Sequence, residues 1–401
     1  MKKILFAPPY ITNKEIRLVK KVLKSGWITT GPMVMKFQQM IRDYVQSEEV
    51  LCLNSATAGL ELVLRWYGIG PGDEVITTPY TFTATANVIL HVGAKPVFVD
   101  VLEKDFNIDP NKVYDAINEK TKAVIAVDFG GCPCDYDKIY EAIKSKSNLF
   151  LPNNSLQESI KRPLLISDAA HSFGSIYKEK KVGCIADFTV FSFHAVKNLT
   201  TAEGGAITIK TLNDIKAETI YKKLKIMSLH GQSKDAFIKG RENTWFYSIL
   251  EAGYKYNMTD IQASIGIGQL EKYDYILKKR KEIFNKYNLN LKELENFIKL
   301  PQLDTENTKG NAHLYPIRLK NENLRDKFIE FMSDKKIQCN VHFIPLPLHP
   351  LYKNLGYNIE DYPMAYKNYL SEVSLPIYPQ LRKRDFNRII KETKNFFKNF
   401  N

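Results

Sequence analysis

Short apolar runs alternate with longer amphipathic stretches through the first half of the chain. The apolar runs have the length and composition of buried strands and lie at Asp73–Thr78, Pro96–Val101, Ala123–Phe129, Pro163–Ser167, Phe188–Phe193 and Ala206–Ile209. Most of the stretches between them repeat apolar residues at helical spacing. Because strands that alternate with helices form βαβ units, the pattern predicts an α/β fold with a mainly parallel sheet.

The pattern changes near residue 265. Gly266–Asn288 is predicted to form one long helix, and the segments beyond it lack the regular strand–helix alternation. We therefore expect a large domain at residues 13–265 and a smaller α+β domain at residues 266–401, with the segment 1–12 beside the smaller one. Between Leu149 and Arg162 we expect an additional surface loop.

A lysine follows the predicted strand at Phe188–Phe193. Lys197 lies on a short connection that leads, through Glu203-Gly204-Gly205, into the next strand. A lysine held between two buried strands loses solvation, which lowers its pKa and leaves a neutral amine able to attack a carbonyl. Taken alone, the residue also fits an ordinary surface lysine.

An acid closes the strand that precedes this lysine. Asp168 follows the apolar run Pro163–Ser167, at the carboxyl end of a strand, where open α/β sheets bind their ligands. Pyridoxal phosphate chemistry needs a lysine for the Schiff base and an acid that keeps the ring nitrogen protonated. Asp168 and Lys197 supply this pair, although Asp168 alone also suits the N-cap of a following helix.

A phosphate site is predicted upstream. The segment Asn54-Ser55-Ala56-Thr57-Ala58 leads into a helix with Leu60, Val63 and Leu64 on one face. The free N–H groups at that helix start and the Ser55 and Thr57 hydroxyls form an anion site. Plain N-capping by serine or threonine explains the same residues without a ligand.

Together these segments resemble the DegT/DnrJ/EryC1/StrS family of sugar aminotransferases, which are fold-type I pyridoxal phosphate enzymes. The resemblance extends from about Gly31-Pro32 to the C-terminus and includes Gly70–Ile76, Thr81–Asn87, Gly93–Asp100, Asp168–His171 and Gly253–Asp260. It implies a mainly parallel seven-stranded sheet with a smaller α+β C-terminal domain. Ser55–Thr57, Ser192–His194 and Ala202–Gly205 are most similar to enzymes that aminate C4 of a UDP-linked 4-keto sugar, such as UDP-4-amino-4-deoxy-arabinose aminotransferases.

The resemblance also implies roles for single residues. Lys197 matches the Schiff-base lysine, and Asp168 matches the acid paired with the pyridine nitrogen. The other cofactor positions are His171 beside the 3-hydroxyl, Phe82 on the ring, Ser55, Ala56, Thr57 and Ser192 at the phosphate, and Asn257 at the phosphate of the neighbouring subunit. Thr30, Gly31, His342 and Phe343 match segments that border the sugar pocket.

Several of these residues also have a plain structural explanation. His171 suits a satisfied core histidine and Phe82 an ordinary core aromatic. Asn257 suits the cap of a helix that begins near Asp260. Thr30 and Gly31 suit a tight turn, and His342 and Phe343 suit a core strand.

The resemblance implies that a homodimer with shared active sites moves an amino group from L-glutamate to a keto sugar. The acceptor is expected to be a UDP- or dTDP-linked 4-keto-6-deoxy or related sugar, used for cell-surface polysaccharide or glycan biosynthesis. Alternatives are an aminotransferase for a cyclitol or a triose phosphate, a pyridoxal phosphate sugar dehydratase, and a non-catalytic regulatory protein on the same fold. Dehydratases that resemble this family carry histidine in place of the Schiff-base lysine, so Lys197 argues against them.

The charge, hydropathy and cysteine content of the chain exclude several classes of partner. The net charge of +13 is dispersed over solvated helix faces, so we expect no nucleic-acid partner. The sequence has no run of 18 apolar residues, and Met1–Pro9 is too short for a signal peptide, so we expect no membrane association. The odd, scattered set of five cysteines suits a reducing cytoplasm. Cys132-Pro133-Cys134 lacks metal-ligand spacing, so no metal site is expected.

Overall fold

A seven-stranded sheet forms the centre of the protein in the computed structural model, which describes residues 2–235 and 245–398. Its strand order is β1-β9-β8-β5-β4-β2-β3, and only β9 runs against the others. The strands are β1 (Glu49–Leu53), β2 (Glu74–Thr77), β3 (Lys95–Phe98), β4 (Thr121–Val127), β5 (Leu164–Asp168), β8 (Phe188–Ser192) and β9 (Gly205–Ile209). The predicted α/β class and mainly parallel sheet are confirmed.

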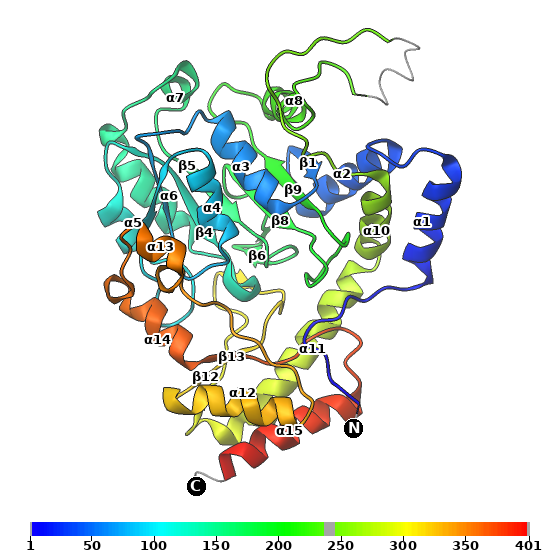
Figure 1. The fold of residues 1–401 in the computed structure, drawn as a ribbon, viewed down its shortest axis with the longest axis vertical. Coiled ribbons are helices and arrows are strands. Elements are labelled where there is room, and N and C mark those ends of the chain that lie inside the picture. The colour runs from blue at the N-terminus through cyan, green and yellow to red at the C-terminus, as the bar shows by residue number, and fades with distance from the viewer. Residues whose placement is uncertain (1, 236–244, 399–401) are drawn as a thin grey trace.

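Helices cover both faces of the sheet (Figure 1). One face packs against α3 (Ala56–Trp66), α4 (Ala84–His91) and α8 (Ala217–Met227). The other face packs against α2 (Pro32–Val45), α5 (Pro110–Ala116), α6 (Tyr136–Ser145), α10 (Asp260–Leu270) and α11 (Tyr273–Leu291). Because successive strand residues point to opposite faces, Ile125 packs toward α3 whereas Val124 and Ala126 pack toward α6.

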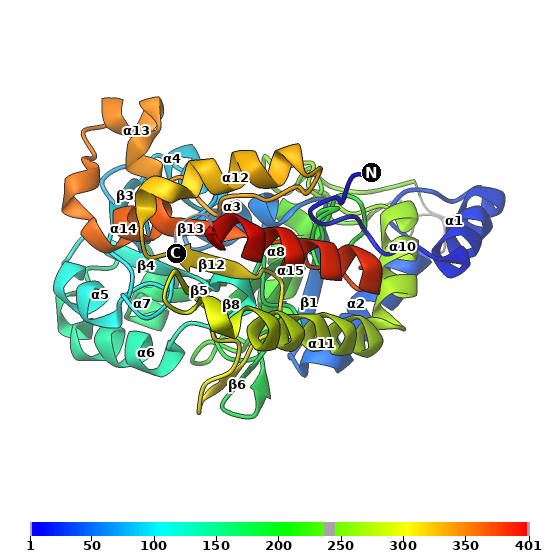
Figure 2. The same cartoon turned by 90° about the horizontal axis from the view of Figure 1, so that it is seen from below.

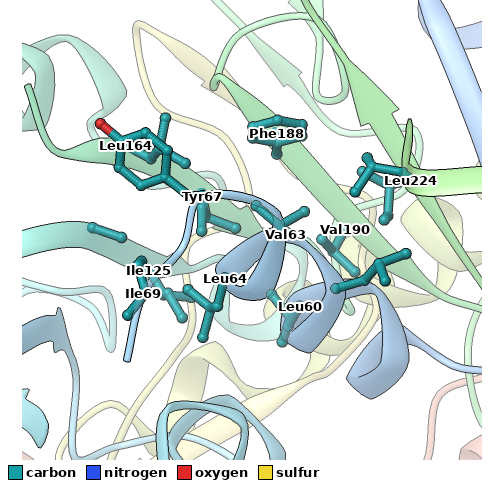
Figure 3. Packing of buried hydrophobic residues seen from close by; sticks show 14 of the residues in the cluster. Leu60, Val63, Leu64, Tyr67, Ile69, Ile125, Leu164, Phe188, Val190 and Leu224 are labelled. Carbon is teal, nitrogen blue, oxygen red and sulfur yellow. The ribbon is translucent and has the colours of Figure 1, made fainter. Parts of the chain in front are cut away.

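Helix α3 lies across the centre of its sheet face. Leu60, Val63, Leu64 and Tyr67 point from it onto strands β4, β5 and β8 (Figure 3). Gly59 permits this close approach, since a Cβ there would lie 2.8 Å from the Val190 side chain. The N-terminus of α3 is thereby fixed beside the carboxyl ends of β5 and β8.

The C-terminal part packs below the sheet (Figure 1). Its core joins α11 to β10 (Ile298–Lys299), β12 (Pro316–Leu319), β13 (Glu372–Ser374), α12 (Arg325–Asp334) and α15 (Lys383–Lys398). Seen from below, α15 lies between α11 and α12 (Figure 2). The N-terminal Ile4 joins this core and pairs with Ile337. The other elements of the described residues are α1 (Asn13–Ser25), α7 (Ser155–Ile160), α13 (Pro350–Asn354), α14 (Pro363–Ser371), β6 (Ile176–Tyr177), β7 (Lys180–Lys181), β11 (Thr308–Lys309) and six short 3-10 turns.

Three local expectations differ from the structure. The sequence pattern did not single out β1. The predicted helix Gly266–Asn288 is two helices, α10 and α11, that meet at Glu271 and Lys272, where the Lys272 ammonium binds Glu15 at 2.6 Å. The loop expected at 149–162 contains α7, which is docked by Gln157 on the Tyr67 carbonyl at 2.9 Å.

The expected boundary at residue 265 lies inside α10. Helix α10 packs with α2 and the sheet, whereas Ile283 and Phe284 of α11 belong to the C-terminal core. We propose that the chain divides into its two parts within α11. No helix in the described part of the chain is long and apolar enough to cross a membrane.

A buried ion pair fixes the base of β5. Asp187 accepts two hydrogen bonds from Arg162, at 2.7 and 2.9 Å, one from the Leu165 N–H and one from the Tyr140 hydroxyl. Asp187→Ala leaves the buried Leu165 N–H without its acceptor and the part-buried Arg162 without its ion-pair partner, so we expect unfolding by urea to show a loss of about 2–3 kcal/mol. Glu218→Ala, which removes an exposed pair with Lys222, is the control and should cost little. Equal losses in the two variants would contradict this account.

Candidate active site

A cavity of about 420 Å³ opens where β5 and β8 end and α3 begins. From the sheet side it is lined by Ser55, Ala56, Thr57, Phe82, Thr85, Asp168, His171, Ser192 and Lys197, and from the C-terminal part by His313, Leu314, His342, Phe343 and Ile377. This position agrees with the general rule that open α/β sheets bind ligands at the carboxyl ends of their strands.

Lys197 lies in the connection between β8 and β9. Its backbone N–H donates to the His194 carbonyl at 2.9 Å, which closes a tight turn. Burial lowers the pKa of its ammonium from 10.5 to about 8, while the negative charge of Asp168 acts in the opposite direction. Above this pH the side chain is mainly the neutral amine, the form that reacts with carbonyls.

Asp168 is the last residue of β5 and is 6% exposed. Its Oδ2 accepts from the Thr85 hydroxyl at 2.8 Å, and its Oδ1 accepts from the Ala170 N–H at 3.2 Å. Burial raises the pKa of its carboxyl, and these two hydrogen bonds together with the charge of Lys197 partly offset the rise. The chain after Asp168 forms turns, so the alternative that Asp168 caps a helix is wrong.

The start of α3 forms a cradle for an anion. The Ser55 hydroxyl accepts from the Ala58 N–H at 3.0 Å, so Ser55 is the N-cap of the helix. The N–H groups of Ala56 and Thr57 lie in the first turn, where a helix offers no acceptor of its own. Gly205 faces this turn, and a Cβ there would lie 2.5 Å from the Ala56 nitrogen. The missing side chain therefore keeps the cradle open.

His171 is buried and its proton position is defined. Its Nδ1 accepts from the Gly130 N–H at 3.2 Å. Burial and the positive charge of Lys197 hold the pKa of the imidazole well below its usual value, so the ring is neutral. A neutral ring that accepts at Nδ1 carries its proton on Nε2. His171 therefore offers a donor, as a partner of a phenolic oxygen should.

His342 stands at the end of a chain of hydrogen bonds from the C-terminal part. Its Nδ1 lies 2.9 Å from the Ser374 hydroxyl, which donates to Glu372 Oε1 at 2.5 Å. Glu372 Oε2 accepts from the His342 backbone N–H at 2.8 Å. Burial lowers the pKa of His342 to about 3, so this imidazole is also neutral. Its neighbour Phe343 stacks on His171, with ring centroids 5.9 Å apart.

Phe82 lies at the mouth of the cavity and is 62% exposed. Its ring centroid is 6.3 Å from that of Phe343. The alternative that Phe82 is an ordinary core residue is therefore wrong. An exposed aromatic face at a cavity entrance is suited to stack on a planar ligand.

Three predicted site residues line a different cavity. Thr30, Gly31 and Asn257 border a hollow of about 280 Å³ beside α2 and β1. The Asn257 amide donates to the Thr30 hydroxyl at 2.7 Å. Asn257 does not cap α10, because Thr259 is the N-cap of that helix. Within one chain these residues are thus separate from Lys197.

The cavity also contains residues that the sequence did not single out as site residues. His313 and Leu314 precede β12, and His194 and Glu203 flank the entrance, with His194 Nε2 3.6 Å from Glu203 Oε1. His194 and Glu203 lie in segments that carry the family resemblance, but the resemblance assigned them no role of their own. For His313, the available signal is a histidine in the otherwise apolar segment Ala312–Leu314.

The residues present fit pyridoxal phosphate. An amine with a lowered pKa, a buried carboxylate, a neutral histidine donor, an exposed aromatic ring and a helix N-terminus match its aldehyde, pyridine nitrogen, 3-oxygen, ring face and phosphate respectively. All five groups line the same cavity.

Comparisons with known proteins agree with this set of groups. Residues 9–394 match the model of the DegT/DnrJ/EryC1/StrS aminotransferase family. The spore coat polysaccharide biosynthesis protein SpsC of Bacillus subtilis is 37% identical over 98% of this chain and 97% of its own. Spr1654 of Streptococcus pneumoniae, named as a sugar aminotransferase, has a PLP-form structure with 41% identity, a TM-score of 0.94 and 99% coverage of both chains.

The PMP-form structure of Spr1654 matches equally well, with 42% identity and a TM-score of 0.94 over 99% of this chain and 98% of that chain. Helicobacter pylori PseC, an aminotransferase involved in the biosynthesis of pseudoaminic acid, is 28% identical, with a TM-score of 0.87 over 99% of this chain and 100% of its own. The resemblance noted in the sequence is thereby confirmed at the level of the family. The cofactor is pyridoxal phosphate, and the chain belongs to the DegT/DnrJ/EryC1/StrS aminotransferase family.

Proposed function

We propose that this protein transfers an amino group from L-glutamate to the ketone of a nucleotide-linked sugar, for polysaccharide or glycan biosynthesis. The observation that carries the proposal is the wall of the cavity opposite the cofactor groups. It presents the neutral, hydrogen-bonding imidazoles of His313 and His342, and among the described lining residues Lys197 is the only lysine or arginine. Such a wall suits an acceptor that carries hydroxyl groups, such as a sugar, better than an acceptor that carries a carboxylate.

The relatives support the same class of acceptor. SpsC acts in spore coat polysaccharide biosynthesis, PseC in pseudoaminic acid biosynthesis, and Spr1654 is named as a sugar aminotransferase. We propose a UDP- or dTDP-linked 4-keto sugar as the acceptor, with the UDP-linked 4-keto pentose of the arabinose series among the candidates. We also place the reaction in the cytoplasm, because all five cysteines are free thiols.

Each residue of the site then has a defined task. Bound pyridoxal phosphate supplies an electron sink that stabilises negative charge at the reacting carbon. Lys197 holds the cofactor between turnovers, and its free Nζ takes the proton from Cα of the amino donor and later delivers a proton to the sugar carbon. Asp168 holds the proton on the ring nitrogen, and Nε2–H of His171 donates to the 3-oxygen.

The remaining residues bind the cofactor and orient the acceptor. The N–H groups of Ala56 and Thr57 and the hydroxyls of Thr57 and Ser192 bind the phosphate, and Ser55 keeps the helix start in shape. Phe82 covers the ring face and excludes water from it. His342 and Phe343 orient the acceptor, with the His342 ring fixed by Ser374.

A mass-spectrometric screen tests the proposal. We expect the purified enzyme with L-glutamate to aminate one or more of a panel of UDP-, dTDP- and GDP-linked 4-keto sugars, gaining one amino group per molecule. Lys197→Ala is the control and should lose multiple turnover, because no other described side chain in the cavity offers an amine. Amination of a keto cyclitol or a triose phosphate, with none of the nucleotide sugars, would overturn the choice of acceptor.

We further propose that two chains form a homodimer with shared active sites. Asn257 and Thr30 line a cavity that lacks a cofactor group, so they need a second chain to act at the phosphate and the sugar. Ile16 and Leu23 lie seven residues apart on one exposed face of α1, and Ile28 and Met35 are exposed nearby. Exposed apolar side chains such as these suit burial in an interface between copies.

Mixed dimers test this arrangement. A Lys197→Ala chain paired with an Asn257→Asp chain has one doubly damaged site and one intact site if Asn257 acts across the interface. We expect recovery of up to about half of the wild-type activity per heterodimer, as the two-site symmetry requires. The matched control mixes Lys197→Ala chains with each other and should stay inactive. Verified subunit exchange without recovery would mean that Asn257 acts within its own chain.

A further inference from the structure

His313 is a buried histidine that the proposed function uses as part of the cavity wall, without assigning a contact to either of its ring nitrogens. It precedes β12 and lines the cofactor cavity, and the residue is 5% exposed. Its ring centroid lies 4.4 Å from that of His171. A polar ring placed so close to the reacting groups requires a partner for each of its nitrogens.

The proton of His313 is assigned by its neighbour Asn198. The Asn198 amide Nδ2 donates to the Asn311 carbonyl at 3.1 Å, so its Oδ1 is the atom that faces His313. His313 Nδ1 lies 3.0 Å from this oxygen and must therefore carry the proton. The amide cannot turn over, because its nitrogen would then face the ring and its oxygen would face a carbonyl.

The imidazole is also neutral. Burial holds its pKa well below the usual value, and the positive charges of Lys197 and Arg280 act in the same direction. A neutral ring with its proton on Nδ1 leaves Nε2 as a bare acceptor. Among the described residues, no donor makes a hydrogen bond to this nitrogen.

The backbone around His313 is fixed from three sides. Buried Arg280 of α11 donates to the carbonyls of Ala312 and His313 at 2.9 and 2.6 Å. The His313 N–H donates to Asn311 Oδ1 at 3.0 Å, and the Asn311 amide donates to the carbonyls of His171 and Phe173. The acceptor atom is therefore held at a defined place in the cavity wall, without freedom to turn away.

We propose that Nε2 of His313 accepts a hydrogen bond from an O–H or N–H group of a reactant and is thus a further substrate-binding residue. This inference rests on the proposed transamination, in which both reactants carry such donors: the hydroxyls of the sugar and the amino group of the amino acid. The C-terminal part contributes His313 and His342 to the same wall, which favours a sugar hydroxyl as the donor. An unpaired buried acceptor costs free energy until a ligand satisfies it, so the contact contributes to both affinity and selection.

Two substitutions separate this role from a structural one. His313→Asn places an amide nitrogen near the former Nδ1, which keeps the bond to Asn198 but removes the acceptor at Nε2. His313→Gln places its longer amide near the former Nε2, which keeps an acceptor there but gives up the bond to Asn198. A substrate-binding role predicts that Asn is the damaging change, and a purely structural role predicts the reverse.

Single-turnover measurements of the two half-reactions identify the donor. We expect His313→Asn to lower the efficiency of the half-reaction with the keto sugar about 10- to 100-fold, the scale of one hydrogen bond to a buried acceptor, while glutamate still converts the bound cofactor at nearly the wild-type rate. His313→Gln should retain most of the activity with the sugar. Loss confined to the glutamate half-reaction would assign the bond to the amino group instead. Wild-type activity in His313→Asn together with lowered activity in His313→Gln would overturn the inference.

The apo protein gives a readout that needs neither cofactor nor turnover. In protein with ¹⁵N-labelled histidine, the signals missing from His313→Asn identify His313, and we expect them to report a neutral ring protonated on Nδ1 at pH 7. A ring protonated on Nε2, or on both nitrogens, would contradict the proposal. If the wild type aminates no nucleotide sugar, the proposed acceptor fails, and this spectrum and the glutamate half-reaction still decide the role of His313.

Discussion

A buried carboxylate that is held only by neutral donors is the feature on which the active site depends. Asp168 ends β5 inside the cavity, where its hydrogen bonds come from a hydroxyl and a backbone N–H. A buried negative charge is costly unless a positive charge accompanies it. Among the described residues, Lys197 is the cationic side chain that acts on Asp168, and its own pKa is lowered by burial. The pair is therefore incomplete without the positive ring nitrogen of the cofactor.

Three histidines of the cavity add no charge beside Asp168 and Lys197. His171, His313 and His342 are all neutral, because burial and the ammonium of Lys197 hold their pKa values down. His171 and His313 each have one ring nitrogen engaged by a fixed partner, the Gly130 N–H and the Asn198 amide oxygen respectively. Both ring nitrogens of His342 have partners, Nδ1 at the Ser374 hydroxyl and Nε2 at the Asn340 amide nitrogen. Three imidazoles of defined orientation thus provide hydrogen bonds without adding a charge that would compete with the cofactor.

A polar network beneath the cavity supports this arrangement. The carboxylate of Asp128, at the end of β4, accepts from the Tyr136 and Ser172 hydroxyls at 2.6 Å each and from the Cys134 N–H at 2.9 Å. Since Ser172 follows His171, the network fixes the turn after Asp168 to the neighbouring strand. The precision of the site therefore derives from the sheet and not from the loops alone.

Much of this organisation follows from local sequence. Apolar runs of strand length placed Asp168 and Lys197 at the carboxyl edge of a parallel sheet, and the family motifs led to His171, Ser192 and Phe82, all of which line one cavity. The bonds from Ser374 to His342 and from Asn198 to His313 join residues 32 and 115 positions apart, so no local pattern encodes them. The same holds for α7, whose docking depends on Gln157 reaching the end of α3. Thr30, Gly31 and Asn257 have motif positions of the site but lie in another cavity of the same chain, which sequence spacing cannot reveal.

The glutamate half-reaction of Asp168→Asn tests the central claim most directly. The substitution keeps the shape and the bond from Thr85 but removes the charge that holds the proton on the ring nitrogen. The account predicts that stopped-flow absorbance will show conversion of the bound cofactor slowed by about 100-fold or more, the scale of one preorganised electrostatic group, with little change in thermal stability. Conversion at the wild-type rate would contradict it.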